Sequence, residues 1–491
     1  MANETLKRLG EKVCSEYLGF IPTSNSTKPP HIANGLFRAC TGETCNTNDV
    51  HEWVLSDGEK DAVPSEKLIE DYSEILENGF TEKPTNIKQF RYFLNEIFDQ
   101  DNTLYPNYKF SVMLLSSHWM IKKRLNSEAR IGDFIFEILA KKIDGKRSPA
   151  IDLLVSALGN DTDDLTKLVK PIIAYPSDKE KRTKDGVQFP EDEEIKWDAC
   201  KNVIRQGFDR LTANIILTGE SKNSLLVLRR IVNFSMFATF LYLAQGNSAL
   251  YGGNIPPIVL DAGADLDSVK AASEQTYTLA KKTVEDFFIN SLNSILKEEI
   301  GKDTDADCRR WIDEMILPPA KEGEIKSAVV SYYESFLHEG DSAMMALSKA
   351  LQIALYTFEY RSNSPSAFCR VLGVRCGLVG PKGNRANIKR YLINSFTLET
   401  ITLSALSTED LKSSIEFKDL SDRFITAYNI LIGSDAESEY ALLERCNIAQ
   451  ATPGDLRGDL SLNAQCFANT YISLGLGKRY ADGVTLIGWR L

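Results

Sequence analysis

One loop of the sequence concentrates the residue types that bind phosphate groups. It reads GVRCGLVGPKGNRANIKRY, residues 373–391, and places four glycines among lysines and arginines. A P-loop needs G-x-x-x-x-G-K-[ST], in which the lysine reaches the terminal phosphates and the hydroxyl binds magnesium. Here Gly383 is followed by Asn-Arg, and Gly377, Gly380 and Gly383 are too evenly spaced for the dinucleotide pattern G-x-G-x-x-G. The loop therefore matches neither nucleotide-binding motif.

The charge around this loop carries more information than its glycines. No aspartate or glutamate occurs from Arg361 to Leu398, although the whole chain has a net charge of −11. Lysines and arginines on a glycine turn can grip phosphates, with affinity from released counterions. The same cations can instead contact a partner protein or pair with acids elsewhere in the chain. The candidate contact residues for nucleic acid or a partner are Arg370, Arg375, Lys382, Arg385, Lys389 and Arg390.

A second stretch gathers the side chains that bind zinc. HIANGLFRACTGETCNTNDVH, residues 31–51, holds His31, Cys40, Cys45 and His51. Four zinc-type ligands in a loop-rich segment suit a structural metal, which would help such a segment to fold. However, four residues separate the cysteines and the histidines flank them singly, which is not the spacing of a standard finger. Zinc and packed thiols with surface histidines both remain open.

Other catalytic arrangements are weakly supported. With four histidines and no G-x-S-x-G elbow, the sequence offers no correctly spaced nucleophile and base. Asp261 follows the apolar run IPPIVL and would end a buried strand, a position that metal-binding acids occupy in some enzymes. The alternative is a turn or cap aspartate. The rival functional class is therefore a metal-dependent nucleic-acid-processing enzyme that uses the His31–His51 segment or Asp261.

Composition limits where the protein works and what it contacts. At 491 residues the chain can form two or three domains. An acidic chain does not coat nucleic acid uniformly, so any such contact is confined to a patch. The N-terminus has no long apolar core of a secretory signal, and the nine scattered cysteines are typical of reduced thiols. We expect a cytoplasmic protein.

One segment is apolar enough to cross a membrane. Ser224 to Ala244 is long enough, but Arg229, Arg230 and Asn233 lie near its middle. A central arginine costs about 2.5–3.5 kcal/mol in lipid on insertion scales. We expect a buried core helix whose arginines emerge on one side, and no membrane partner.

The elements that position these residues are mostly helical, and the fold class is mainly α with few strands. The first 60 residues are rich in loop-forming types and are expected to be irregular. Apolar spacing predicts helices elsewhere, and a charged segment predicts a linker. Helices are expected at 65–79, 86–98, 110–125, 131–143, 149–158, 199–217, 224–244, 266–300, 387–406, 417–431 and 461–474, with a strand at 255–263. The expected domains are an N-terminal helical domain (1–177), a linker (178–198), a central helical domain (199–360) and a C-terminal domain (361–491).

The C-terminal region has the element order of a winged helix. Three predicted helices precede GKRYADGVTLIGWRL, in which Asp482-Gly483 is a hairpin turn signal between two β-prone runs. Residues 391–491 contain 13 acidic and 8 basic side chains. A winged helix without a basic recognition helix favours contact with protein over direct reading of DNA.

A resemblance supports the same interpretation. FKDLSDRFITAYNILIG (417–433) and LSLNAQCFANTYISLGLGKRYADGVTLI (460–487) resemble C-terminal regions of uncharacterised bacterial proteins from anti-phage defence operons. Those proteins often accompany a HerA-like ATPase or another DNA motor. The resemblance covers about 75 residues, rests on the apolar pattern and the closing ribbon, and brings no catalytic residue. It implies a protein partner, such as an ATPase, in a DNA-associated assembly.

The sequence thus favours a non-catalytic subunit or adaptor of a multi-protein assembly, which docks through its C-terminal region and needs no cofactor other than the zinc left open above.

Overall fold

The computed structural model describes residues 4–22, 28–45, 121, 123–159, 182–382 and 388–489. These residues form a mainly α-helical fold with a few short strands, which confirms the predicted fold class. The predicted helices at 65–79, 86–98 and 110–125 lie outside or almost wholly outside the described residues.

The N-terminal part contributes short helices and one two-stranded ribbon. Its elements are α1 (Thr5–Lys12), the π-helix η1 (Val13–Leu18), α2 (Pro29–Thr41), β1 (Glu43–Cys45), η4 (Asn126–Glu128), α7 (Ile131–Ala140), α8 (Pro149–Gly159) and β2 (Arg182–Lys184). Strands β1 and β2 pair antiparallel, so a piece of the expected linker forms a ribbon edge.

The expectation of irregular structure through the first 60 residues is wrong at α1 and η1, and also at α2. Pro29 and Pro30 occupy the first two positions of this helix, where a missing N–H costs nothing because it would have no intrahelical partner. The Nδ1 atom of His31 accepts the backbone N–H of Lys28 at 3.1 Å and so helps to cap the helix. The prolines that predicted a loop therefore begin a helix.

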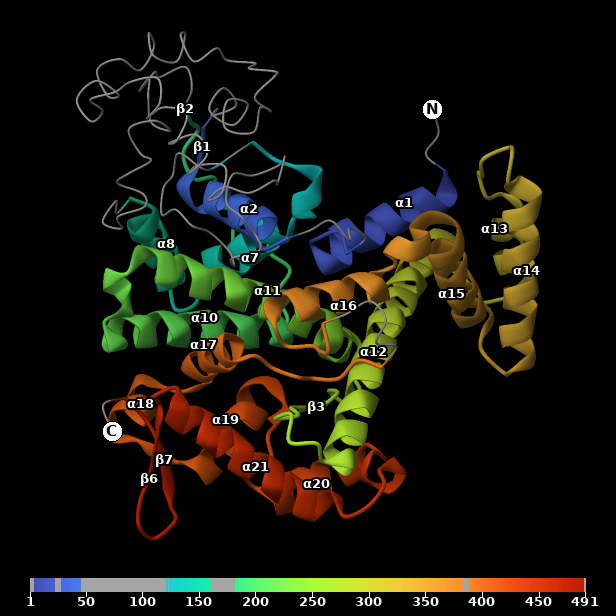
Figure 1. Ribbon diagram of the computed structural model, residues 1–491. Helices are drawn as coiled ribbons and strands as arrows, with labels where there is room; N and C mark the ends of the chain where they lie inside the picture. The colour runs from blue at the N-terminus through green and yellow to red at the C-terminus, as the bar shows by residue number, and fades with distance from the viewer. Residues whose placement is uncertain are drawn as a thin grey trace, which may run out of the picture.

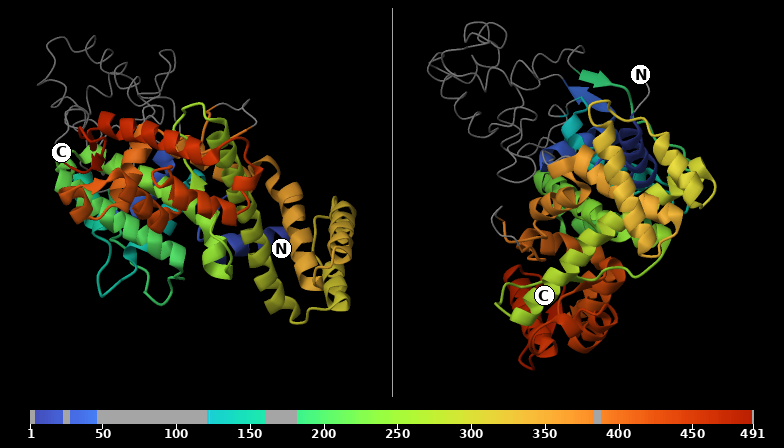
Figure 2. Two further views of the ribbon diagram at one scale, coloured as in Figure 1. Left: turned by 90° about the horizontal axis from the view of Figure 1, so that it is seen from below. Right: turned by 90° about the vertical axis from the view of Figure 1, so that its right-hand side faces the viewer.

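The central part is built around one long buried helix. Its elements are α10 (Ala199–Thr218), η5 (Glu220–Lys222), α11 (Ser224–Tyr251), β3 (Ile258–Val259), α12 (Asp267–Ile300), α13 (Asp305–Asp313), α14 (Glu322–His338), α15 (Ala343–Ala354) and the π-helix η6 (Leu355–Tyr360). Helix α11 packs against α8, α10, α12 and α16 (Pro365–Cys376), as Figure 1 shows. Figure 2 shows α13, α14 and α15 projecting at one end of the molecule.

Helix α11 is the membrane-span candidate of the described residues, and 83% of its most apolar window is buried inside the fold. The prediction that its arginines emerge on one side is wrong. Arg229 is half-buried and its guanidinium lies 4.3 Å from the centre of the Phe396 ring. Arg230 is only 2% exposed and pairs with Glu220 and Glu399. The charge of Arg230 is therefore paired inside the protein, as the burial of a charge requires.

The C-terminal part adds a layer against the central helices (Figures 1 and 2). Its remaining elements are η7 (Arg361–Asn363), α17 (Ser395–Ala405), α18 (Thr408–Ser413), β4 (Ile415–Glu416), α19 (Phe417–Tyr428), β5 (Ile430–Leu431), α20 (Ala436–Arg445), η8 (Ala449–Ala451), α21 (Leu456–Ser473), β6 (Gly477–Arg479) and β7 (Thr485–Ile487). The sheet order is β4-β7-β6, with both pairs antiparallel.

Two short strands tie this layer to the central part. Ile258 and Val259 of β3 pair in parallel with Ile430 and Leu431 of β5. The buried amide of Asn463 donates to the carbonyl oxygens of residues 260 and 432, and its oxygen accepts the N–H of residue 262. Within the described residues, a large hydrophobic cluster includes residues from 6 to 487, and a second, smaller cluster contains Val259 of β3 and Leu431 of β5. The predicted domain boundaries stay a prediction.

Candidate functional site

Two of the candidate residues from the sequence contact each other. Arg390 of the basic loop donates from Nε to Oδ2 of Asp261 at 2.5 Å, and Asp261 is only 1% exposed. The other carboxylate oxygen accepts the N–H of Gly263 at 2.7 Å. The backbone of the same segment pairs too, since the N–H of Asp261 donates to the carbonyl oxygen of Tyr391 at 2.8 Å. Asp261, which follows the end of β3, therefore anchors the basic loop (residues 373–391).

The other candidate cations of this region differ in how far they are buried. Lys389 is buried, and its Nζ donates to the carbonyl oxygen of Pro381 at 2.5 Å. Arg370 and Arg375 lie half-buried on α16, and Lys382 is exposed. Arg385 lies outside the described residues. Their roles in contacting nucleic acid or a partner stay predictions.

One glycine of this loop has a backbone conformation that other residues rarely adopt. Gly377 ends α16 in the left-handed region, with φ of +84°. A Cβ at that position would lie 1.7 Å from Nδ2 of Asn394. Asn394 caps α17 by accepting the N–H of Thr397 at 2.8 Å, so Gly377 allows the end of one helix to meet the start of the next.

The predicted helix at 387–406 begins eight residues late, at Ser395. Residues 388–394 are extended instead, because Gly380 and Arg390 exchange two backbone hydrogen bonds of 3.0 Å. This extended stretch is what places Arg390 against Asp261.

The histidine–cysteine segment does not close around one ion. His31 and Cys40 lie nine residues apart on the single helix α2, which separates them by about 13 Å along the axis. Zinc ligands lie about 2.0–2.3 Å from the ion, so these two residues cannot share one. Cys40 is 1% exposed and burial raises the pKa of its thiol.

The other two predicted ligands are not tested. His51 lies outside the described residues, and nothing is described of the Cys45 side chain. No group of three or more histidine, cysteine, aspartate or glutamate side chains able to hold a metal occurs in the described part of the chain. A zinc site that uses His51 or Cys45 stays a prediction.

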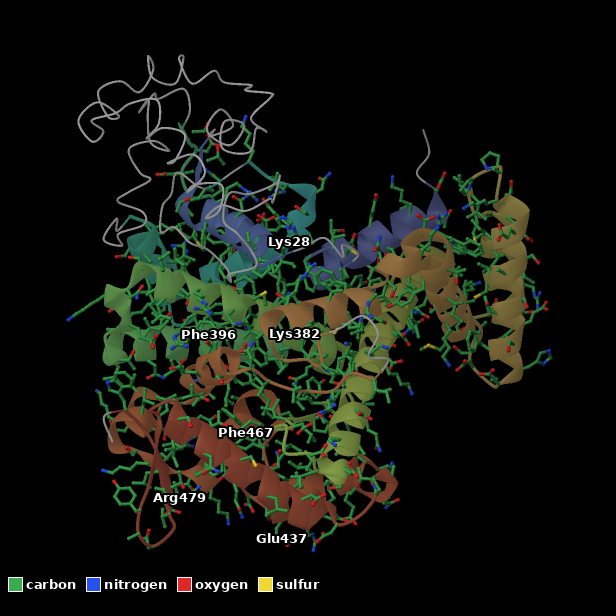
Figure 3. The ribbon with its side chains drawn as sticks, viewed as in Figure 1. Lys28, Lys382, Phe396, Glu437, Phe467 and Arg479 are labelled. Atoms are coloured by element: carbon green, nitrogen blue, oxygen red, sulfur yellow. The ribbon has the colours of Figure 1, made fainter. Side chains whose placement is uncertain are left out.

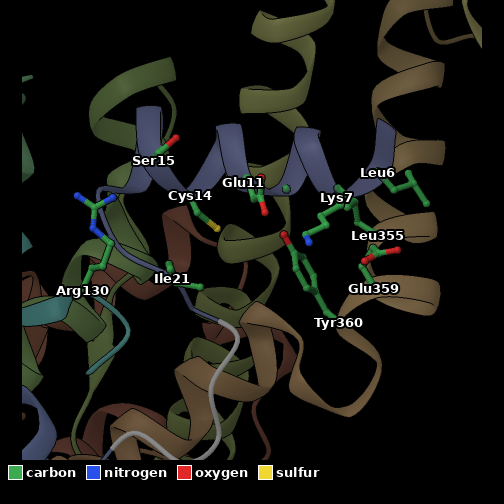
Figure 4. A pocket seen from close by; sticks show the side chains of 11 residues that line it. Leu6, Lys7, Glu11, Cys14, Ser15, Ile21, Arg130, Leu355, Glu359 and Tyr360 are labelled. Atoms are coloured by element: carbon green, nitrogen blue, oxygen red, sulfur yellow. The ribbon is translucent and has the colours of Figure 1, made fainter. Parts of the chain in front are cut away.

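A cavity of about 490 Å³ lies between the two π-helices. Figure 4 shows α1 and η1 on one side of it, with Tyr360 of η6 and Arg130 reaching toward it. Its thiol is Cys14, and burial raises the pKa of that thiol to about 12. A thiol that stays protonated near neutral pH is a poor nucleophile. The Cys14 thiol is therefore a poor candidate for a catalytic nucleophile.

Helix α21 presents a surface that the sequence analysis did not single out. Leu462, Gln465, Asn469 and Ile472 follow one another at helical spacing and all are exposed, Leu462 to 47% and Ile472 to 36%. No charged residue occurs from Leu460 to Gly477, although 25% of the chain is charged. This run of 18 uncharged residues is visible in the sequence and could have marked the surface. We call these four residues the α21 face.

A groove of about 500 Å³ continues this face toward the β6–β7 hairpin. Phe417, Ala464 and Ala468 line it together with Val484, which is 36% exposed on the hairpin. At its edge, Arg479 donates to Oδ1 of Asn469 at 3.1 Å. Figure 3 shows Arg479 on the hairpin and Lys382 near α16.

A buried carboxyl group stabilises the turn before α20. Glu439 is fully buried; its two oxygens accept the hydroxyl of Ser421 at 2.7 Å and the N–H of Gly433 at 2.6 Å. Burial raises the pKa of Glu439 from its ordinary value of 4.5 to about 7. The C-terminal layer therefore carries an acid that changes its protonation near neutral pH.

This shift predicts a pH dependence of stability. Because the folded pKa of Glu439 is raised, its contribution is complete below pH 4.5 and is lost as the pH rises to about 7. The loss amounts to about 3 kcal/mol. We expect Glu439→Gln to flatten the decline of the thermal midpoint across this window, whereas Glu437→Gln, at an exposed position of the same helix, keeps it. Equal pH profiles for both variants would contradict the assignment.

Comparison with known proteins adds no relative. No family model matches the chain, and no curated protein and no solved structure matches it.

Proposed function

We propose that this chain is a non-catalytic subunit or adaptor of a multi-protein assembly, and that it docks on a partner protein through its C-terminal region. The observation that carries the proposal is the α21 face, an exposed helix surface with no charged side chain. The buried centres of protein–protein interfaces are depleted in charged residues. An uncharged exposed face in a chain of net −11 has the composition of such a centre.

The element order of the C-terminal layer supports a winged-helix-like unit. A strand (β4) precedes α19–α21, a hairpin (β6–β7) follows them, and the first strand pairs with the last. In that architecture α21 would be the recognition helix that enters a DNA groove. Helices that grip DNA carry lysines and arginines for the phosphates. Helix α21 has only Arg457, whose guanidinium lies 4.3 Å from the Tyr440 ring centre, so we assign α21 to protein contact.

The wider setting of the proposal has less support. The resemblance to proteins of anti-phage defence operons is the reason to propose a DNA-associated assembly with an ATPase partner. Exposed Lys382 is available for a nucleic-acid contact of that assembly. Eight described cysteines carry no disulfide, which supports a cytoplasmic setting.

Charge placed on the α21 face tests the proposal. We expect the double variant Leu462→Glu/Ile472→Glu to lose the partner that co-purifies with the tagged chain from its native host, at least about 100-fold, because two buried carboxylates would each cost several kcal/mol. Both positions are exposed in the free chain, so its thermal midpoint should barely change. The matched control is Val155→Glu on α8, where the valine is 41% exposed.

The readout is the ratio of partner to chain, measured by quantitative mass spectrometry. The control is expected to retain the wild-type ratio. Retention of the same partner by the double variant would refute docking through α21, and equal loss in the Val155→Glu control would do the same.

A further inference from the structure

A third recess is lined by none of the residues of the α21 face. It has a volume of about 720 Å³ and is formed by α12, the N-terminal half of α16 and the extended residues Ile388 and Lys389. Tyr277 and Lys281 of α12 line one side, and Arg370 of α16 lines another. We call it the α12–α16 groove. Its size is in the range of small-molecule sites, about 300–1,000 Å³.

The groove is cationic. Lys281, Arg370 and Lys389 line it against one carboxylate, Glu274. Within the described residues, neither Lys281 nor Arg370 has an ion-pair or hydrogen-bond partner. Lys389 is 8% exposed and is oriented by its hydrogen bond to the carbonyl oxygen of Pro381. Two cations that make no ion pair among the described residues favour the binding of an anion, although the chain has a net charge of −11.

The start of α16 adds to this field. Ser366 and Ala367 of its first turn line the groove, and the 12-residue helix directs the positive end of its dipole there. Ser364 caps the helix by accepting the N–H of Ala367 at 3.2 Å. Ser366 is held by Glu285, to which its hydroxyl donates at 3.1 Å. A helix N-terminus beside lysine and arginine is a recurrent arrangement around phosphate groups.

A buried hydroxyl supplies the independent sign of a ligand. Tyr277 lines the groove and is only 4% exposed, yet its hydroxyl has no hydrogen-bond partner among the described residues. Its ring is held edge-on by Tyr391 at 5.6 Å. Burial raises the pKa of Tyr277 and the nearby charge of Arg370 opposes the rise, so the hydroxyl lies in the field of that cation. Buried hydroxyls normally have partners, and a bound oxyanion would provide one.

We propose that the α12–α16 groove binds a mononucleotide, with its phosphates held by Lys281, Arg370, Lys389 and the Tyr277 hydroxyl. Ile388 is 60% exposed at the rim and offers an apolar contact for the base. Lys389 and Tyr277 are only 8% and 4% exposed, which favours a small ligand over nucleic acid. The groove has neither a P-loop nor a dinucleotide motif, so motif searching does not detect it. This site is independent of the docking proposal.

Isothermal titration of the full chain tests the site with three probes, namely ADP, adenosine and a 12-nucleotide single strand without terminal phosphates. We expect ADP to bind and adenosine to bind at least about tenfold more weakly, because charge-assisted hydrogen bonds to the phosphates are lost. Lys281→Gln and Arg370→Gln should each weaken ADP about tenfold or more. Tyr277→Phe should weaken ADP without lowering the thermal midpoint of the free protein, since the hydroxyl it removes has no described partner.

The matched control is Lys282→Gln, because Lys282 is exposed, follows Lys281 on α12 and does not line the groove. It should bind ADP as the unaltered chain does. Three outcomes overturn the proposal: no binding of ADP, equal ADP affinity in the unaltered chain and all four variants, or binding of the single strand without binding of ADP.

Discussion

Replacing Arg230 by methionine is expected to destabilise the protein by about 3–5 kcal/mol, the cost of removing one partner from a buried ion pair. Arg230 donates from Nε and Nη2 to the two oxygens of Glu220 at 2.5 and 2.7 Å. Its Nη2 also lies 2.9 Å from a Glu399 oxygen, and Nη1 donates to Thr400 at 3.1 Å. Without the guanidinium, the carboxylates of Glu220 in η5 and Glu399 in α17 would lose the cation that they share.

The neighbouring arginine provides the control. Arg229 stacks on Phe396 and no ion pair is described for it, so Arg229→Met should lower the thermal midpoint far less than Arg230→Met. Thermal unfolding of both variants, followed by circular dichroism, makes the comparison. Equal shifts for the two would show that the ion-pair network contributes nothing.

Replacing Asp261 by alanine is expected to cost about 3 kcal/mol, since it leaves Arg390 without its carboxylate and the N–H of Gly263 without its acceptor. The basic loop would lose its anchor on the central part. A catalytic aspartate would behave in the opposite way, because active-site acids are often removed at little cost to stability, or even with a gain.

A double-mutant cycle isolates the pair. Asp261→Leu and Arg390→Met should each destabilise strongly, and the double variant should cost much less than the sum of the two. Thermal midpoints of the three variants provide the measurement. Additive losses would mean that the two side chains do not interact, and an unchanged midpoint in Asp261→Ala would reopen a catalytic role for this residue.

The helices with uninterrupted apolar spacing could be predicted from the sequence. Helices α10, α11 and α12 begin within one residue of the predicted positions, because a capping side chain or a turn precedes each of them. Local signals of this kind are complete within a few residues. The predicted helix at 417–431 ends early, since Asn429 adopts a left-handed conformation and Ile430 and Leu431 pair with β3 instead.

Contacts between distant segments could not be predicted in this way. The pair of Asp261 and Arg390 spans 129 residues, and the burial of Arg230 depends on Glu399 in another helix. Each of these residues appeared in the sequence as a separate charge. The sequence therefore predicts one basic surface, whereas in the structure Arg390 of this loop binds Asp261 and joins two segments of the chain.

The two proposed sites differ in how much the sequence shows of them. The α21 face is a run without charge, which composition alone reveals. The α12–α16 groove draws Lys281 from one helix, Arg370 from another and Lys389 from an extended stretch, so no spacing along the chain predicts it. Sites assembled from several elements require the fold first.

The most direct measurement of the central claim is site-specific photo-crosslinking from the α21 face. A photoreactive amino acid at Gln465, in the chain expressed in its native host, is expected to form one covalent adduct with a second protein, identified by mass spectrometry. The same group at Val155 should form none. Absence of an adduct at Gln465, or an adduct that consists only of two copies of this chain, would contradict docking on a partner protein through α21.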